Sequence, residues 1–322
     1  MNTAGAIIRT DRSLAAALVG WYDGHARDLP WRHPDTSAWG VLVSEVMLQQ
    51  TPVARVEPAW RAWLDRWPTP AALGPASPGD AVRMWGKLGY PRRALRLRDC
   101  AQVLVREHGG EVPVDVDALL ALPGVGGYTA RAVATFAYGQ RHPVVDVNVR
   151  RVLARAVLGR GEPGPASTNR DLADVEALLP ATAEDAARFS VAIMELGALV
   201  CTAAGPRCDA CPIAACCVWR LAGSPPYAGP RVRPQRFAGT DRQVRGLLLD
   251  VLRAADHPVR AGDLDLAWAE PMQRARALDS LIADGLVDPL ADGRFALPGR
   301  TPDAANLGDG RGAGPTRRMA AG

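Results

Sequence analysis

Four cysteines close together near position 200 constrain the fold of this chain more than any other feature. Cys201, Cys208, Cys211 and Cys217 follow the spacing C-x6-C-x2-C-x5-C, and they are four of the six cysteines in 322 residues. Thiolates are soft ligands that select zinc or an iron–sulfur cluster. Zinc sites usually pair their ligands in two short units, and this loop has only one. The spacing therefore favours a [4Fe-4S] cluster, with Cys216 as an alternative fourth ligand to Cys217.

The composition predicts a soluble intracellular protein. No basic N-terminal region precedes a long apolar run, and no stretch approaches the roughly 18 apolar residues of a membrane span. We therefore expect a cytoplasmic protein with reduced thiols and no membrane partner. The formal net charge of +4 permits nucleic-acid binding without arguing for it. No oligomer-forming seam is evident, and we expect a monomer.

The fold class is predicted to be mainly α. Residues 12–222 show apolar positions at helical spacing, separated by short Gly/Pro segments, and residues 1–222 form the main predicted domain. Residues 223–240 contain four prolines and are predicted to be a linker. A small α+β domain is expected over 241–298, and the Gly-, Ala- and Arg-rich residues 299–322 are expected to be disordered.

The pattern within 241–298 is typical of a winged-helix domain. Helices are predicted near 242–255, 263–269 and 272–284, followed by a hairpin around Asp292-Gly293. The third helix carries Gln273, Arg274 and Arg276. These side chains either face DNA or form an ordinary solvated surface, and the sequence favours neither interpretation.

A glycine-rich turn opens a helix at residues 122–131, which read LPGVGGYTAR. Glycines such as Gly124 and Gly126 allow the backbone to approach a ligand, and free N–H groups at a helix start attract an anion. With short helices predicted near 115–121 and 128–138, the turn fits the hairpin of a helix-hairpin-helix motif. Such a hairpin binds one DNA phosphate without reading sequence. The alternative is a plain connection between two helices.

Two carboxylates are candidates for acid–base chemistry. Glu45 lies in the apolar stretch WGVLVSEVML, where burial would raise its pKa and make it a general acid near neutrality. Its alternative is a solvent-facing position on an amphipathic helix. Asp146 precedes a predicted helix, where it fits an ordinary N-cap, and a cap's N–H donors would keep it ionised. Sequence alone does not pair residues so far apart.

Six segments, which include the string SEVMLQQT, together resemble the MutY family of adenine DNA glycosylases, in the helix-hairpin-helix, endonuclease III-like superfamily. In matching order within roughly residues 12–222, they are Leu29–Arg32, Ser44–Thr51, Leu88–Tyr90, Leu122–Thr129, Val145–Arg155 and Met194–Cys217. The resemblance implies two helical subdomains that hold double-stranded DNA and a flipped adenine between them. It implies removal of adenine mispaired with 8-oxoguanine or, more slowly, with guanine, and hence a nucleoid-associated protein.

The resemblance also assigns roles. Glu45 would protonate adenine N7, and Asp146 would stabilise the sugar cation or trap it covalently, with Tyr128 and Asn148 positioning Asp146 and the sugar. The implied cluster ligands are the four cysteines named above, and the cluster would be structural. The implied substrate and DNA contacts are Trp31 and Arg32 in the adenine pocket, Gln50 and Tyr90 in the duplex, and the matching motif residues Thr51, Leu88, Gly124 and Gly126.

Several positions separate this chain from its relatives. Bifunctional relatives carry lysine where this chain has Tyr128, so we expect a monofunctional enzyme that leaves an abasic site. Pro91 replaces the usual second tyrosine after Tyr90, and Val191 replaces a pocket glutamine. Residues 241–298 are too short for the NUDIX-like domain with which many relatives read 8-oxoguanine. Tyr90 and this domain are therefore our candidates for that role.

Two other functions remain open at this point. A thymine or uracil mismatch glycosylase would share Tyr128, Asp146 and the cysteine loop. Glu45 favours adenine, because a pyrimidine has no N7 to protonate. A non-catalytic DNA-binding or redox-sensing protein would use the cluster and the C-terminal domain, but the two carboxylates at catalytic positions argue against it.

Overall fold

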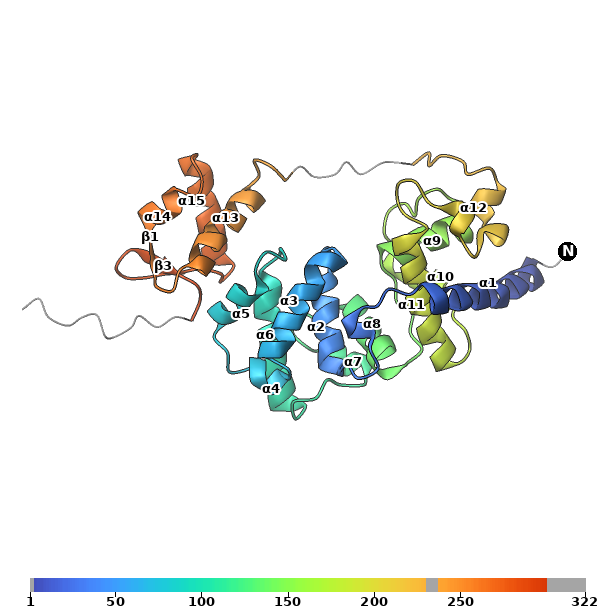
Figure 1. Ribbon diagram of the computed structural model, residues 1–322, viewed down its shortest axis with the longest axis horizontal. Helices are drawn as coiled ribbons and strands as arrows, with labels where there is room; N and C mark the ends of the chain where they lie inside the picture. The colour runs from blue at the N-terminus through green and yellow to red at the C-terminus, as the bar shows by residue number, and fades with distance from the viewer. Residues whose placement is uncertain (1–2, 230–236, 300–322) are drawn as a thin grey trace, which may run out of the picture.

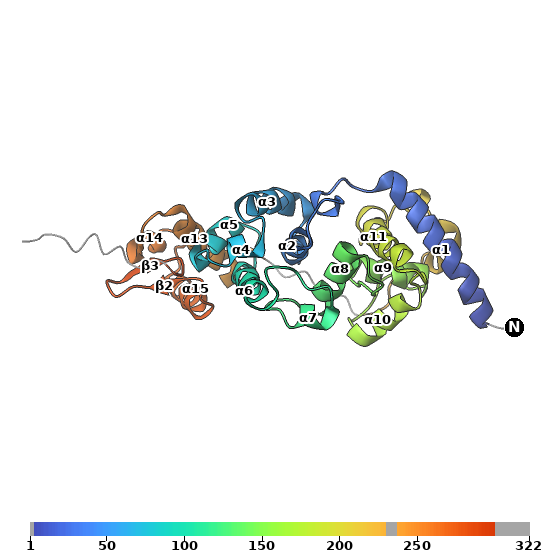
Figure 2. The same cartoon turned by 90° about the horizontal axis from the view of Figure 1, so that it is seen from below.

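A computed structural model describes residues 3–229 and 237–299. The predicted disordered tail lies outside these residues except for Gly299, as does the middle of the predicted linker. No helix within the described ranges is long and apolar enough to cross a membrane. The described part of residues 1–222 is built from helices, turns and loops, as the helical periodicity predicted. Figures 1 and 2 show these helices in two groups.

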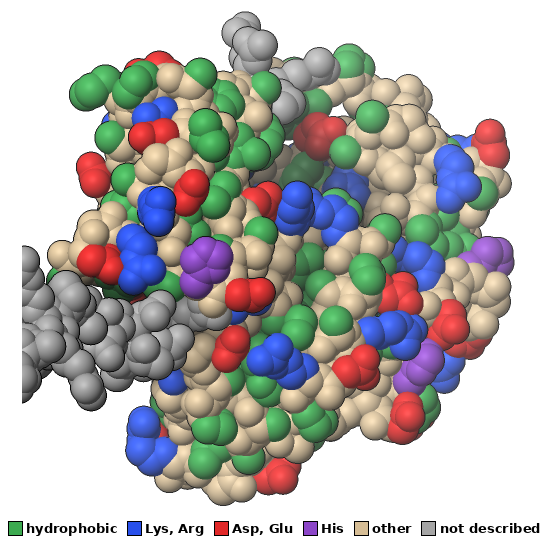
Figure 3. All heavy atoms as spheres, turned by 60° about the vertical axis from the view of Figure 1, so that its left-hand side comes forward, with side chains coloured by type: hydrophobic (Ala, Val, Ile, Leu, Met, Phe, Trp, Pro, Cys, Tyr) green, Lys and Arg blue, Asp and Glu red, His purple; other side chains and the backbone are tan. Residues whose placement is uncertain are grey.

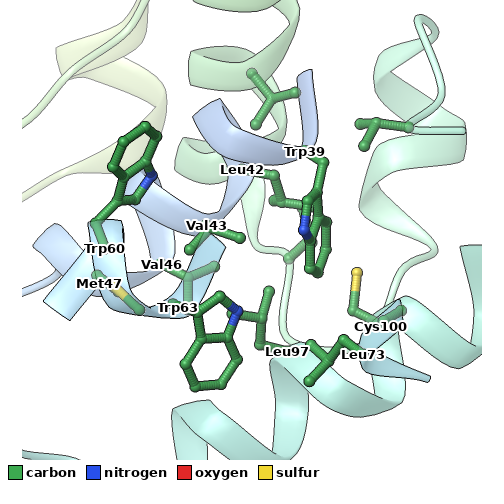
Figure 4. Packing of buried hydrophobic residues seen from close by; sticks show 14 of the residues in the cluster. Trp39, Leu42, Val43, Val46, Met47, Trp60, Trp63, Leu73, Leu97 and Cys100 are labelled. Atoms are coloured by element: carbon green, nitrogen blue, oxygen red, sulfur yellow. The ribbon is translucent and has the colours of Figure 1, made fainter. Parts of the chain in front are cut away.

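One helical group is formed by a continuous run of the chain. Its members are α2 (Ala38–Leu48), α3 (Val53–Arg66), α4 (Pro70–Leu73), α5 (Pro78–Trp85), α6 (Arg92–Glu107), α7 (Val116–Leu120) and α8 (Gly127–Tyr138). The core of this group centres on α2, which buries residues on every side (Figure 4). A helix that is apolar all round belongs in a core, and each fully buried Leu, Val or Met contributes roughly 1.5–3 kcal/mol.

The second group joins the N-terminal helix to helices that follow much later in the chain. It contains α1 (Thr3–His25), α9 (Val147–Ala156), α10 (Thr168–Glu176) and α11 (Ala183–Leu199), and its core includes Leu18, Phe189 and Leu196. Short turns η2 (Cys208–Ala210) and η3 (Ala214–Cys216) and helix α12 (Val218–Leu221) complete the cysteine loop against α9. The N-terminal helix therefore packs on α11, far from its sequence neighbours in α2.

The glycine-rich turn between α7 and α8 has a tight backbone. Gly124 has a φ of +79°, and a Cβ added there would lie 2.8 Å from Cβ of Arg96 on α6. Both the dihedral angle and the contact therefore require glycine at this position. Asp115 caps α7 by accepting a hydrogen bond from the Ala118 backbone N–H at 2.9 Å. The two helices predicted on either side of the glycine-rich turn are present, and the first N–H groups of α8 follow the turn directly.

Residues 241–298 form a third unit of helices and a small sheet. It contains α13 (Asp241–Ala254), α14 (Ala261–Asp265) and α15 (Pro271–Ala283), with strands β1 (Val259–Arg260), β2 (Asp288–Pro289) and β3 (Arg294–Ala296). The antiparallel sheet has the order β1-β3-β2, with Val259 opposite Phe295 and Asp288 opposite Ala296. The second helix is shorter than expected, and a strand not expected from the sequence, β1, joins the hairpin. The winged-helix assignment stays a prediction.

Candidate active site between the two helical groups

A large cavity lies between the two helical groups. It measures about 1380 Å³ and is lined by Glu45 from α2, Tyr128 from α8, and Asp146 and Asn148 from the start of α9. The fold therefore brings together the two carboxylates that the sequence alone did not pair. Charged groups of both signs are interspersed on the face shown in Figure 3, rather than gathered in one basic strip, in keeping with the modest net charge.

Glu45 is a buried acid that faces this cavity. Its residue is 6% exposed, and burial raises its pKa from 4.5 to about 7, against a hydrogen bond from the Tyr128 hydroxyl that lowers it. The negative charge of Asp146 adds to the increase. Near neutral pH a large fraction of Glu45 is therefore protonated and able to act as a general acid. Burial also raises the pKa of Tyr128 well above 10, so its hydroxyl remains a donor.

Asp146 caps α9 and accepts three hydrogen bonds. The backbone N–H groups of Asn148 and Val149 donate to Oδ1 at 2.9 and 2.7 Å, and Asn148 Nδ2 donates to Oδ2 at 2.8 Å. Burial nevertheless outweighs these bonds and raises the pKa of Asp146 above 3.8. The sequence led us to expect that the cap's hydrogen bonds would control the pKa of Asp146. Burial has the larger effect, because the cap lies where two helices meet.

The first turn of α9 is held by contacts that the sequence analysis missed. A Cβ on Gly197 would lie 2.6 Å from Cβ of Asn148, so glycine allows α11 to approach the first turn of α9. Arg151 donates to Asn148 Oδ1 at 2.6 Å and to the carbonyls of Gly197 and Cys201 at 2.7 and 2.6 Å. Asn148 is thus fixed between Asp146 and the beginning of the cysteine loop.

Trp31 and Arg32 also line the cavity, on the short turn η1 (Pro30–Arg32). Arg32 Nη2 donates to Glu195 Oε2 at 2.9 Å, and Arg27 makes two further side-chain hydrogen bonds to the same carboxylate. Burial would raise the pKa of Glu195, but these hydrogen bonds outweigh it and lower the pKa to about 2. Arg32 Nη1 is buried without a partner among the described residues, so one donor remains free beside the cavity. Val191 contributes an apolar wall there.

Glu195 was not identified from the sequence, although its signal resembles that of Glu45. It lies in the apolar stretch VAIMELGALV, and its side chain is fully buried. An acidic residue in such a stretch must be paired or protonated. Arg27 and Arg32 form ion pairs with Glu195. Glu45 has no such ion pair among the described residues and is therefore a candidate to carry a proton.

Gln50 and Tyr90 form a projecting pair at the end of α2. Both have positive φ angles, +55° and +46°, which are strained for side chains of this size. The Tyr90 hydroxyl donates to Gln50 Oε1 at 2.7 Å, and Tyr90 is 46% exposed. Gln50 and Thr51 line the cavity, as do Gly124 and Gly126, whereas Leu88 and Tyr90 are not among its lining residues.

Arg93 fixes the backbone beneath that pair. Its guanidinium donates to the carbonyls of Val46 and Gln49, both at 2.7 Å, and to that of Gly89 at 3.1 Å. Its Cζ also lies 5.4 Å from the centre of the Tyr90 ring. Leu88 is buried in the core, and its carbonyl accepts a hydrogen bond from Thr51 Oγ1 at 3.2 Å. The strained conformations are therefore held by a half-buried cation, which the sequence did not distinguish from its neighbours.

The four predicted cluster ligands line one small cavity beside α9. Arg155 Nη1 lies 3.5 Å from Cys201 Sγ and donates to the Thr202 carbonyl at 2.7 Å. Cys216 does not line this cavity, and its Sγ donates to the Ile213 carbonyl at 3.4 Å. No three of the described His, Cys, Asp and Glu side chains are gathered as ligands of one metal ion. The donor set is nevertheless that of soft thiolates with a cationic neighbour, which fits an anionic iron–sulfur cluster.

Comparison with known proteins places the chain among base excision repair enzymes. Residues 43–176 match the family described as HhH-GPD superfamily base excision DNA repair protein. The adenine DNA glycosylase of Mycobacterium tuberculosis is 61% identical over 283 residues, which cover 88% of this chain and 92% of that protein. That of Mycolicibacterium smegmatis is 60% identical, with 88% and 95% covered. The structure of a thermostable thymine-DNA glycosylase aligns with a TM-score of 0.61 and 24% identity, over 67% of this chain and 99% of that one, which shows a shared fold.

Proposed function

Because the chain belongs to the adenine DNA glycosylase family within the HhH-GPD superfamily, we propose that it removes adenine mispaired with 8-oxoguanine or guanine in double-stranded DNA. The protein is a DNA N-glycosylase, and therefore a hydrolase. The observation that carries the proposal is the pair of carboxyl groups in one cavity, with the pKa of Glu45 at about 7. Adenine offers N7 to such an acid, whereas thymine and uracil have no equivalent atom.

The proposed reaction starts when the adenine nucleotide leaves the stack and enters the cavity, because its bond to the sugar is out of reach inside a duplex. Glu45 transfers its proton to adenine N7. The C1′–N9 bond breaks with its electron pair on the base, and the Asp146 carboxylate stabilises the positive sugar. Water then adds to C1′ and releases a proton, which restores Glu45. The products are free adenine and an abasic site.

We further propose that the enzyme is monofunctional. Cleavage of the strand through a Schiff base requires an amine that attacks C1′. Lys87 is the only lysine in the sequence, and its side chain is 81% exposed and ion-paired with Asp250 at 3.2 Å. Tyr128 stands in the cavity instead, and its raised pKa suits it to donate a hydrogen bond rather than to attack.

Cys201, Cys208, Cys211 and Cys217 are proposed to hold a [4Fe-4S] cluster. Their common cavity and the nearby Arg155 guanidinium support this assignment. When bound, the cluster would cross-link the loop without taking part in hydrolysis. Arg151 and Arg155 would then connect this loop to α9 through their hydrogen bonds to its carbonyl groups.

A product assay tests the proposed function. The protein is incubated with a duplex that carries one A:8-oxoguanine pair, and the released base is identified by chromatography. Borohydride is added in parallel to trap any Schiff base. We expect free adenine, an intact strand until alkali is added, and no trapped adduct. Release of thymine from a T:G duplex without release of adenine would move the protein to the pyrimidine branch, and a trapped adduct would refute the monofunctional mechanism.

A further inference from the structure

The first turn of α13, in the third unit, lies beside the projecting pair formed by Gln50 and Tyr90. Arg242 Nη1 is 3.5 Å from the Tyr90 hydroxyl, and the Arg242 guanidinium lies 5.2 Å from the centre of the Phe237 ring. Phe237 is 51% exposed and Tyr90 46% exposed. We call Phe237, Arg242 and Tyr90 the cross-unit cluster. It combines a cation from the third unit with two exposed aromatic rings, one from the loop before α6 and one from the end of the linker.

The third unit is attached to α5 by a specific and partly buried interface. Val82 of α5 is fully buried in the core of the third unit. Arg83 donates to the carbonyls of Arg253 and Ala255 at 3.0 and 2.8 Å, and Arg253 donates back to the Val82 carbonyl at 3.1 Å.

Two ion pairs extend the contact toward Tyr90. Lys87 pairs with Asp250 at 3.2 Å, and Arg92 pairs with Asp284 at 3.1 Å. Both partners from the catalytic part of the chain lie within three residues of Tyr90. The position of α13 relative to Tyr90 is therefore set by a packed contact, even though the preceding linker contains residues outside the described ranges.

The polar face of α15 is already used inside the third unit. Arg276 pairs with Asp241 through two hydrogen bonds of 3.0 Å, and Gln273 Nε2 donates to the same aspartate at 3.0 Å. Arg274 pairs with Asp265 at 2.7 Å. The interpretation in which these three side chains face DNA therefore receives no support from their contacts. Gln273 and Arg276 fix the start of α13 instead, and Arg242 follows Asp241 directly.

The chemistry of the cross-unit cluster matches an unpaired purine. When adenine leaves the duplex, the base opposite loses its partner and exposes its hydrogen-bonding edges. Guanine offers O6 and N7 as acceptors, which arginine binds with its two parallel donors. In 8-oxoguanine N7 carries a hydrogen, so O6 and O8 are the acceptors on that side. Exposed aromatic rings add stacking on the face of the base.

We propose that Arg242, with Phe237 and Tyr90, contacts the purine opposite the excised adenine and contributes to selection of the mispair. This inference rests on the proposed function, and it assigns the recognition of the opposite base to a residue outside the catalytic groups. The hydrogen bond from the Tyr90 hydroxyl to Gln50 fixes the tyrosine ring. In the proposed complex this ring lies next to the position in the duplex that the adenine has left. Arg242 then approaches the opposite base from the third unit.

Single-turnover excision and equilibrium binding are measured on duplexes in which the base opposite adenine is guanine, 7-deazaguanine, 8-oxoguanine or absent. The variants are Arg242→Ala and Arg242→Lys. Arg294→Ala is the control, because it removes one exposed cation of the same unit, paired with Asp292 on the hairpin. We expect Arg242→Ala to slow excision opposite guanine and 8-oxoguanine by roughly 5- to 150-fold, the range of one two-donor base contact. The lysine variant should recover only part of this loss.

The 7-deazaguanine duplex isolates the base contact, because it lacks only the N7 acceptor. The wild-type protein should lose activity or affinity when guanine is replaced by 7-deazaguanine, and Arg242→Ala should not. With no base opposite adenine, both proteins should behave alike. An equal loss on every duplex would make Arg242 a phosphate contact and overturn the inference, as would no loss on any. If the wild-type protein releases no adenine, the proposed function fails, and binding to the same duplexes still decides the role of Arg242.

Discussion

Replacing Glu45 with glutamine should separate the effect of this carboxyl group on stability from its effect on excision activity. The side chain is buried, and its pKa rises from 4.5 to about 7. A difference of that size corresponds to about 3 kcal/mol between the charged and neutral forms. Because the folded-state pKa is raised, the stability contributed by the neutral acid is present below pH 4.5 and is lost as the pH rises through 7. Glutamine has the same shape, accepts the hydrogen bond from Tyr128 and does not titrate.

The stability of Glu45→Gln relative to the wild type should therefore depend on pH. The free energy of unfolding of the variant, minus that of the wild type, should increase from pH 5 to 8. The total increase relative to acid pH should be about 3 kcal/mol. For a cooperative unit of 150–250 residues, this is roughly 6–12 °C in Tm. Thermal unfolding between pH 5 and 8.5 measures it, with Glu107→Gln on the exposed side of α6 as the control. A constant difference between variant and wild type across this range would refute the assignment of a raised pKa.

The same variant should lose activity while it gains stability. A general acid contributes roughly 100- to 10,000-fold, so excision by Glu45→Gln should fall by at least about 100-fold with binding of the mispaired duplex retained. The wild-type rate should itself decline as the pH rises above about 7, where the acid is no longer protonated. Full activity in the glutamine variant would remove Glu45 from the mechanism.

Five further substitutions test other parts of the site. Asp146→Asn keeps a good N-cap and should leave Tm nearly unchanged, yet it should slow single-turnover excision by roughly 100-fold or more because the sugar cation loses its counter-charge. Arg93→Ala should cost at least about 1.5–3 kcal/mol in a denaturant titration, because it removes charged hydrogen bonds to several carbonyls, and it should weaken mispair binding. Arg151→Met should slow excision more than it weakens binding, because Asn148 loses its support; equal effects would argue against a positioning role. Cys217→Ser should lower bound iron and visible absorbance, whereas Cys216→Ser should preserve both.

The sequence predicted the helices and drew attention to the candidate acid Glu45 because their signals are local. Apolar periodicity indicated α2 and α9, and the glycine-rich turn fixed the start of α8. Glu45 was identified because a carboxylic acid within an apolar helix demands an explanation. Its partnership with Asp146 came from resemblance, since the two residues meet only after two groups of helices have assembled around one cavity.

Apart from Arg32, the arginines that organise the site were not predicted, because their roles depend on contacts between distant segments. Of the 38 basic residues, all but Lys87 are arginine, so residue type alone distinguishes none of them. Arg93 gathers carbonyls from α2 and from the loop before α6, and Arg151 joins Asn148 to Cys201. The contact that distinguishes Arg242 from other exposed arginines is with Tyr90, which lies 152 positions earlier in the chain.

The DNA-facing interpretation of α15 shows the same limit. Gln273, Arg274 and Arg276 have a spacing that suits a recognition helix, but Asp241 and Asp265 occupy their polar groups. A helical pattern predicts which residues share a face. It does not predict whether that face meets solvent, DNA or another part of the same chain.

The proposed adenine glycosylase activity is tested most directly by single-turnover excision on four duplexes that differ in one pair, A:8-oxoguanine, A:G, T:G and U:G, each analysed with and without alkali. We expect strand breakage at A:8-oxoguanine, and more slowly at A:G, only after alkali. Breakage at T:G or U:G in place of these pairs, breakage without alkali, or no breakage on any duplex would contradict a monofunctional adenine glycosylase.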